Sequence, residues 1–141
     1  MKKSNIAGAI IAFVTIVLES LPYGAVLNFG KPNSDGSIGF IRKTYSYFSF
    51  TPFGYANLGP LLTAISSCLL LCIIVTSIFI KKNTLQKSSG ILSILAFLTS
   101  LMPLLQGVRY YSICGLAISI LLSGEIILYL IKRRKDGDCI S

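Results

Sequence analysis

Four runs of predominantly apolar residues, each 19 to 23 residues long, set the strongest limit on how this chain can fold. They cover residues 6–27, 58–80, 90–108 and 111–131. An α-helix rises 1.5 Å per residue, so about 20 such residues cross roughly 30 Å of hydrocarbon. We therefore expect four transmembrane helices. A mean hydropathy of +0.75 and a charged fraction of only 13% also favour a membrane protein over a soluble one.

The first apolar run begins like a secretory signal, because Lys2 and Lys3 precede it. Three features favour a retained helix instead. The run is longer than the apolar region of a signal, it contains Glu19, and no small-residue cleavage site follows Pro22. We therefore expect this segment to stay in the protein as a signal-anchor helix.

Basic residues set the expected orientation, because Lys and Arg near the ends of a span resist translocation. With a cytoplasmic N-terminus, nine basic residues lie on the cytoplasmic side and four on the outer side. The cytoplasmic set is Lys2, Lys3, Lys81, Lys82, Lys87, Lys132, Arg133, Arg134 and Lys135, and the outer set is Lys31, Arg42, Lys43 and Arg109. We expect a multi-pass protein of the cytoplasmic membrane, inserted in one orientation with both termini in the cytoplasm.

The connections between the runs are short, apart from one. An outer loop of about 30 residues, 28–57, follows the first run, whereas residues 81–89 and a turn at Arg109 and Tyr110 join the later runs. Short connections make consecutive helices antiparallel neighbours. The sequence thus predicts a single all-α domain over residues 1–141, an up-down bundle of four transmembrane helices with one aromatic-rich outer loop.

Small residues at steps of three or four positions mark one face of each expected helix. In lipid, such faces allow helices to approach closely. The expected stripes are Gly8, Ala12, Thr15, Glu19 and Tyr23; Ala64, Cys68, Cys72 and Thr76; Ser93, Ala96, Ser100, Pro103 and Gly107; and Gly115, Ser119 and Ser123. We expect them to form the interior of the bundle, and a substrate path lined by the same residues is the alternative. Pro22 and Pro103 are expected to kink their helices near the outer ends.

Glu19 is the first candidate functional residue. It lies about 12 Å below the expected outer end of the first helix, where a charged side chain costs roughly 2.5 to 3.5 kcal/mol. Such a carboxylate normally faces other helices, pairs with a cation or takes up a proton. Three interpretations stay open: an ion pair or water-bridged contact with Arg109, a protonatable carboxyl used in transport, and a neutral hydrogen-bonded side chain. Tyr23, one turn further along the helix, completes this candidate charge site.

Glu125 in the last run is a secondary candidate. It precedes Lys132 by seven residues, which places it about 10 Å from the expected inner surface. Its side chain can reach toward the inner lysines or form a hydrogen bond with Tyr129 at the next turn. We therefore expect a structural role, and the different depths of Glu19 and Glu125 argue against a carboxylate pair that shares one proton.

The outer loop concentrates aromatic residues between positions 40 and 55. Alternation at Tyr45 and Tyr47 permits a short strand, paired with residues 26–29 in a β-hairpin. The candidate interaction residues of this loop are Arg42, Lys43, Tyr45, Tyr47, Phe48, Phe50, Phe53 and Tyr55. They predict either an interfacial flap, with rings and basic groups at headgroup depth, or a recognition surface for a partner protein or ligand. The outer location argues against nucleic acid as a partner.

The residues that most enzymes need are missing from the sequence. The chain has no His, and its Cys68 and Cys72 are four apart in an apolar segment, unlike a Cys-x-x-Cys redox pair. No glycine-rich phosphate loop and no nucleophile motif is present, and the five acidic residues form no metal-binding pattern. We therefore expect no enzymatic activity, no metal site and no cofactor.

Two functions agree with this architecture. The first is an accessory role, in which the aromatic loop and the small-residue faces assemble with or regulate other membrane components, in contact with lipid, with partner proteins or with copies of the chain. The second is a small oligomeric transporter or channel that couples to protons or cations through Glu19. With four spans and an acidic residue in the first span, the layout resembles the small multidrug-resistance transporters. The long outer loop, the absence of Trp and the bias of basic residues toward one orientation depart from that family.

Overall fold

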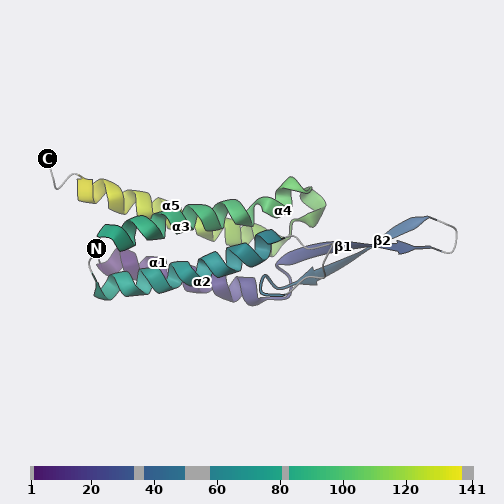
Figure 1. The fold of residues 1–141 in the computed structure, drawn as a ribbon, viewed down its shortest axis with the longest axis horizontal. Coiled ribbons are helices and arrows are strands. Elements are labelled where there is room, and N and C mark those ends of the chain that lie inside the picture. Colours follow the sequence, from purple (N-terminus) through teal and green to yellow (C-terminus); the bar gives the residue numbers. More distant parts are fainter. Residues whose placement is uncertain (1, 34–36, 50–57, 81–82, 138–141) are drawn as a thin grey trace.

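The computed structural model describes residues 2–33, 37–49, 58–80 and 83–137, and it is mostly helical with one two-stranded hairpin (Figure 1). The elements are α1 (Lys2–Ser20), β1 (Ala25–Pro32), β2 (Ile38–Tyr45), α2 (Leu58–Phe79), α3 (Asn83–Ser100), α4 (Met102–Leu105), the short 3-10 helix η1 (Val108–Tyr110) and α5 (Ile113–Gly137). The structure is mostly helical, as expected, and the hairpin allowed for the outer loop is present, so the fold is not entirely α-helical.

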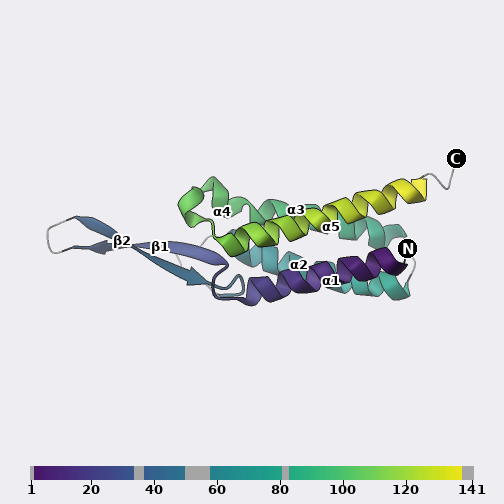
Figure 2. The same ribbon diagram turned by 180° about the vertical axis from the view of Figure 1, so that it is seen from behind.

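The four long helices lie side by side: α1 packs against α2 and α5, and α3 packs against the same two helices (Figures 1 and 2). Helix α1 begins and α5 ends at one end of the molecule, which we call the termini end. The strands, α4 and η1 lie at the opposite end, which we call the hairpin end. Three segments are long and apolar enough to cross a membrane, Leu58–Phe79, Thr84–Leu105 and Ile113–Arg134, while the apolar part of α1, Ser4–Ser20, is shorter.

Helix α1 ends at Ser20, so the expected span over residues 6–27 is too long by one to two turns. Proline disfavours helical backbone at the preceding residue, and Pro22 therefore stops the helix near Leu21. The apolar residues that follow enter β1 instead, where Ala25 to Leu27 are buried. Apolar character alone could not separate a buried strand from the last turns of a helix.

The expected hairpin is confirmed, and it is longer than predicted. Strands β1 and β2 pair antiparallel from Ala25 opposite Tyr45 to Pro32 opposite Ile38. The base of the hairpin is buried against the helices, whereas its far end projects away from them (Figure 1).

The expected span over residues 90–108 is divided between α3 and α4. The break comes at Leu101, because Pro103 lacks the N–H that would continue the hydrogen-bond ladder of α3. Helix α3 also begins earlier than expected, at Asn83. Helix α5 continues past the expected end at Ile131, so the basic residues that follow are helical too.

The helices bury polar side chains and expose apolar ones. Their interior contains Thr15, Glu19, Thr63, Ser66, Ser67, Ser93, Ser100, Ser119 and Glu125. Much of the outer surface is Ile, Leu, Val and Phe. Apolar side chains such as Leu70, Ile118 and Leu122 are buried beside them. An interior with this many polar groups under an apolar surface fits a lipid environment, in which polar groups find their partners between helices.

The small-residue stripe of the first helix is confirmed up to Glu19. Gly8, Ala12, Thr15 and Glu19 are all buried, but Tyr23 lies beyond the end of the helix and is 62% exposed. The stripe therefore predicts the inward orientation of Glu19 correctly and that of Tyr23 wrongly.

The stripe expected in the second helix is confirmed at Ala64 and wrong at Cys72 and Thr76. Ala64 is buried, but Cys72 and Thr76 are exposed and Cys68 is only half-buried. The buried face runs instead through Thr63, Ser67, Leu70 and Ile74. Thr76 satisfies its hydroxyl within its own helix by donating to the Cys72 carbonyl, so it can face lipid.

In α3, α4 and α5 most of the expected stripe residues are inside. The buried ones are Ser93, Ala96, Ser100, Pro103, Gly115 and Ser119, while Gly107 and Ser123 are half-buried. The small residues of these segments therefore mark the packed faces as predicted.

Candidate intramembrane site

Glu19 lies in the last turn of α1 and is fully buried. Its Oε1 accepts a hydrogen bond of 2.8 Å from the Ser67 hydroxyl of α2. Its Oε2 is also buried and has no hydrogen-bond partner among the described residues. The carboxyl therefore joins α1 to α2 through one oxygen and leaves the other without a partner.

The structure does not bring Arg109 to Glu19, so the expected direct ion pair is absent. Arg109 lies exposed on η1, where it shares a groove with residues of the hairpin. Tyr23 is exposed as well and does not join the carboxyl. The reason is local: α1 ends one residue after Glu19, and the chain that returns from the hairpin occupies the space above the carboxyl.

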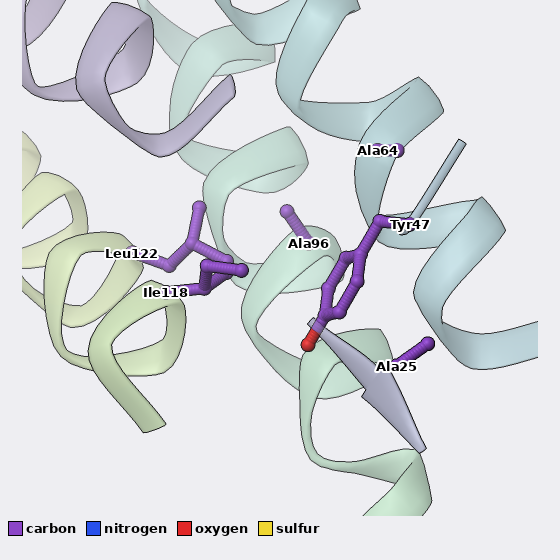
Figure 3. Packing of buried hydrophobic residues seen from close by; sticks show 6 residues of the cluster. All are labelled: Ala25, Tyr47, Ala64, Ala96, Ile118 and Leu122. Carbon is purple, nitrogen blue, oxygen red and sulfur yellow. The ribbon is translucent and has the colours of Figure 1, made fainter. Parts of the chain in front are cut away.

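Tyr47 occupies that space. Its side chain is only 2% exposed, and its ring lies among Ala25, Ala64, Ala96 and Ile118 (Figure 3). The side chain was expected on the surface of the outer loop, and the structure places it in the core instead. Burial raises the pKa of Tyr47, with the nearby Tyr111 and Glu19 adding to the shift, so the phenol stays neutral.

Two close contacts fix Tyr47. Its backbone N–H donates a 2.9 Å hydrogen bond to the Glu19 carbonyl. Its ring lies so close to Gly24 that a β-carbon on residue 24 would be 2.7 Å from Cδ1. Only glycine leaves room for the ring, and the aromatic side chain covers the interior between the helices at the hairpin end.

Hydroxyl groups connect the elements around Tyr47. Ser100 and Ser119 join α3 to α5 at 2.9 Å, and the Tyr111 hydroxyl lies 2.6 Å from Ser119. Ser112 donates to the Gly24 carbonyl at 2.6 Å and accepts from the Gly115 N–H at 2.8 Å, which caps the first turn of α5. These bonds hold the turn after α1 against α5.

Glu125 is the second buried carboxyl, 4% exposed on α5. Its Oε1 has no hydrogen-bond partner among the described residues. Its other oxygen packs on α1, where a β-carbon on Gly8 would lie 3.2 Å from Oε2. Glu125 is turned into the interior beside Gly8, and it shares a pocket with Tyr129 and Lys132, the two residues expected to meet it.

Glu125 lines a polar pocket at the termini end. The cavity is about 30 Å³, which is room for about one water molecule. Its wall consists of Ser4, Asn5, Gly8, Ile74, Ser77, Gln86, Ser89, Ser93, Glu125, Leu128, Tyr129 and Lys132. At its rim the Lys132 ammonium donates to the Asn5 side-chain oxygen at 2.7 Å. The pocket combines a carboxylate oxygen without a partner with several hydroxyls and one ammonium group.

The expected interaction loop is partly on the surface. Arg42, Lys43 and Phe48 are exposed and Tyr45 is half-buried. The Lys43 ammonium lies 5.9 Å from the centroid of the Phe29 ring. The remaining candidates, Phe50, Phe53 and Tyr55, fall outside the described residues.

Sequence reasoning missed Ser67 and the polar pocket. Ser67 follows Thr63 by four residues and precedes Leu70 by three, a spacing that would have found the buried face of α2. The pocket draws on four helices, and no spacing within one segment could have predicted it. Within residues 2–33, 37–49, 58–80 and 83–137, no group of three or more Cys, Asp or Glu could hold a metal ion.

The comparisons with known proteins give no match: no family model, no curated protein and no solved structure matches the chain.

Proposed function

We propose that the protein crosses the cytoplasmic membrane four times with both termini in the cytoplasm. The 17 apolar residues of α1 from Ser4 to Ser20 extend about 25 Å, close to the hydrocarbon thickness, so α1 serves as the fourth span. The start of α1 and the end of α5 also lie at the same end of the molecule. The excess of basic residues at that end supports its cytoplasmic location.

We infer that the interior serves proton- or cation-linked transport, in which Glu19 and Glu125 are the ionisable groups. The observation that carries this proposal is that both carboxyls are buried and each keeps one oxygen without a partner in the described structure. In lipid, a carboxylate without a counter-ion is costly, so each group needs a proton or a cation. A purely structural glutamate would be expected to use both oxygens in hydrogen bonds.

Proton flux into reconstituted vesicles tests this function. We expect the wild-type protein to dissipate a pH gradient, or to couple it to the entry of a cation, and Glu19→Gln and Glu125→Gln to abolish that flux. Asp35→Asn is the matched control, because it removes a carboxyl that the sequence places between the two strands. Wild-type vesicles that move no proton and no monovalent cation under a pH gradient would refute the proposal.

The hairpin supports a second candidate, an accessory role in which it docks on another membrane protein or on a copy of this chain. Ile38, Phe40 and Ile41 are exposed, and they lie on both faces of β2. A two-stranded hairpin is marginally stable by itself in water, so its far end would gain from a partner. No enzymatic step is proposed.

Photocrosslinking distinguishes this role from the first. A photoreactive residue at Ile38 should capture one discrete protein in native membranes, whereas the same group at the buried Tyr47 should not. Recovery of lipid adducts alone from position 38 would rule out the docking role and leave transport unaffected.

A further inference from the structure

Two arginines from distant parts of the chain line one groove at the hairpin end. Arg42 comes from β2 and Arg109 from η1, and the groove between them has a volume of about 370 Å³. Asn28, Phe40 and Tyr110 complete its wall. This volume is typical of a small-molecule site.

The strand register explains how these residues meet. Asn28 lies opposite Arg42, and Phe40 precedes Arg42 by two residues, so all three project from the same face of the hairpin. Strand β1 contacts η1, which brings Arg109 and Tyr110 over that face. Lys43 projects from the opposite face, over Phe29.

The charge of the groove is not neutralised within the described structure. Neither arginine has a hydrogen-bond acceptor or an ion-pair partner among the described residues. Glu19, the acidic side chain described at this end, is buried and bonded to Ser67. Two guanidinium groups over an apolar floor therefore call for an anion that also carries apolar surface.

Exposed apolar side chains lie close in the sequence to the groove residues Arg109 and Tyr110. Val108 begins η1, Leu105 precedes that helix and Ile113 follows it, and their side chains are 79–90% exposed. Apolar side chains this exposed gain free energy when hydrocarbon covers them, which favours a ligand that brings acyl chains to this surface.

We propose that the groove binds the phosphate group of an anionic membrane lipid. Arg42 and Arg109 form charge-assisted hydrogen bonds to the phosphate oxygens, and the Asn28 amide supplies a further donor. The acyl chains lie along Leu105, Val108 and Ile113. This site is separate from the carboxyls of the interior, and it does not depend on the transport function.

Lipid titration of the detergent-solubilised protein tests the site, with bound lipid counted by native mass spectrometry. We expect one tightly bound phosphatidylglycerol in the wild type, a loss of about tenfold in affinity for Arg42→Gln or Arg109→Gln, and no specific binding in the double variant. The matched control is Lys31→Gln with Lys43→Gln, which removes two charges from the opposite face of the same strands and should keep the affinity. Because all four side chains are exposed, both double variants should fold, as circular dichroism would verify.

Inorganic phosphate and glycerol 3-phosphate distinguish a lipid from a free phosphate. We expect neither compound to displace phosphatidylglycerol at millimolar concentration, because both lack acyl chains. Displacement by either one would show a site for soluble phosphate and overturn the assignment to lipid. Equal affinity losses in the arginine and lysine double variants, or none in either, would overturn the site itself.

Discussion

The two buried glutamates lie in the same polar interior, but their surroundings differ. Glu19 at the hairpin end is bonded to Ser67 and covered by Tyr47. Glu125 at the termini end has no such cover and lines a pocket with Asn5 and Lys132 at its rim. One carboxyl therefore lies beneath an aromatic ring and the other beside a pocket with room for about one water molecule. We expect the two identical side chains to exchange protons with solvent at different rates.

The strongest test of this contrast removes the cover. Tyr47→Ala deletes a side chain that is nearly fully buried, and we expect a loss of about 3–5 kcal/mol in the free energy of unfolding. Unfolding by SDS in mixed micelles measures the change. The neighbouring Phe48→Ala is the control, because Phe48 is exposed and should cost far less. Similar losses in the two variants would show that Tyr47 does not close the hairpin end.

A smaller effect is expected from adding one methyl group beneath the same ring. In Gly24→Ala the new β-carbon would lie 2.7 Å from the Tyr47 ring, so ring and backbone must separate, at a cost of about 1–3 kcal/mol. Gly124→Ala is the matched control, because nothing lies within 4 Å of a β-carbon there. The same unfolding assay should find this control neutral or slightly stabilised. An unaffected Gly24→Ala would mean that the ring moves freely.

Carboxyl exchange compares the two glutamates directly. Infrared bands assigned by Glu19→Gln and Glu125→Gln should respond to transfer into D₂O at different rates, with the Glu125 band exchanging several times faster. The reason is that Glu125 lines the pocket, whereas Glu19 is fully buried beneath Tyr47. In Tyr47→Ala the Glu19 band should approach the faster rate. Equal rates in the wild type would contradict the asymmetry.

The smallest expected effect concerns the hydrogen bond at Glu19. Ser67→Ala removes the donor to Oε1 and should lower the free energy of unfolding by about 0.6 kcal/mol, a typical value between membrane helices. Ser123→Ala is the control, since Ser123 donates to the Ile120 carbonyl of its own helix. A loss no larger than that of the control would show that the Ser67 contact contributes no net stability.

The apolar runs predicted the helices, three of which have membrane length, and the small-residue stripe of the first run predicted the inward orientation of Glu19. The alternation in the outer loop predicted a hairpin, although Tyr47 lies beyond its second strand. Each of these predictions depends on how apolar, polar or small residues repeat along a single segment, and this repeat can be read directly from the sequence. The end of α1 was misplaced because residues 21–27 are apolar in either a helix or a strand.

The partners of the carboxyls could not be predicted, because they depend on contacts between segments. Ser67 and Cys68 are neighbours in the sequence, and a rotation of α2 by one residue decides which of them faces Glu19. Likewise, nothing near Tyr47 in the sequence distinguishes a side chain inserted between helices from one displayed at the membrane surface. Gly24 leaves room for the Tyr47 ring, and Gly8 leaves room for the Glu125 carboxyl. The need for glycine at these two positions cannot be recognised until the facing side chains are known.

The hydrogen bond from the Tyr47 N–H to the Glu19 carbonyl has a consequence for biosynthesis. The last carbonyls of a helix need partners, and in α1 one of them is supplied from beyond the hairpin. A ribosome that has released only the first helix has not yet made that donor. Helix α1 therefore acquires its final end only after the hairpin and the chain as far as Tyr47 have been synthesised.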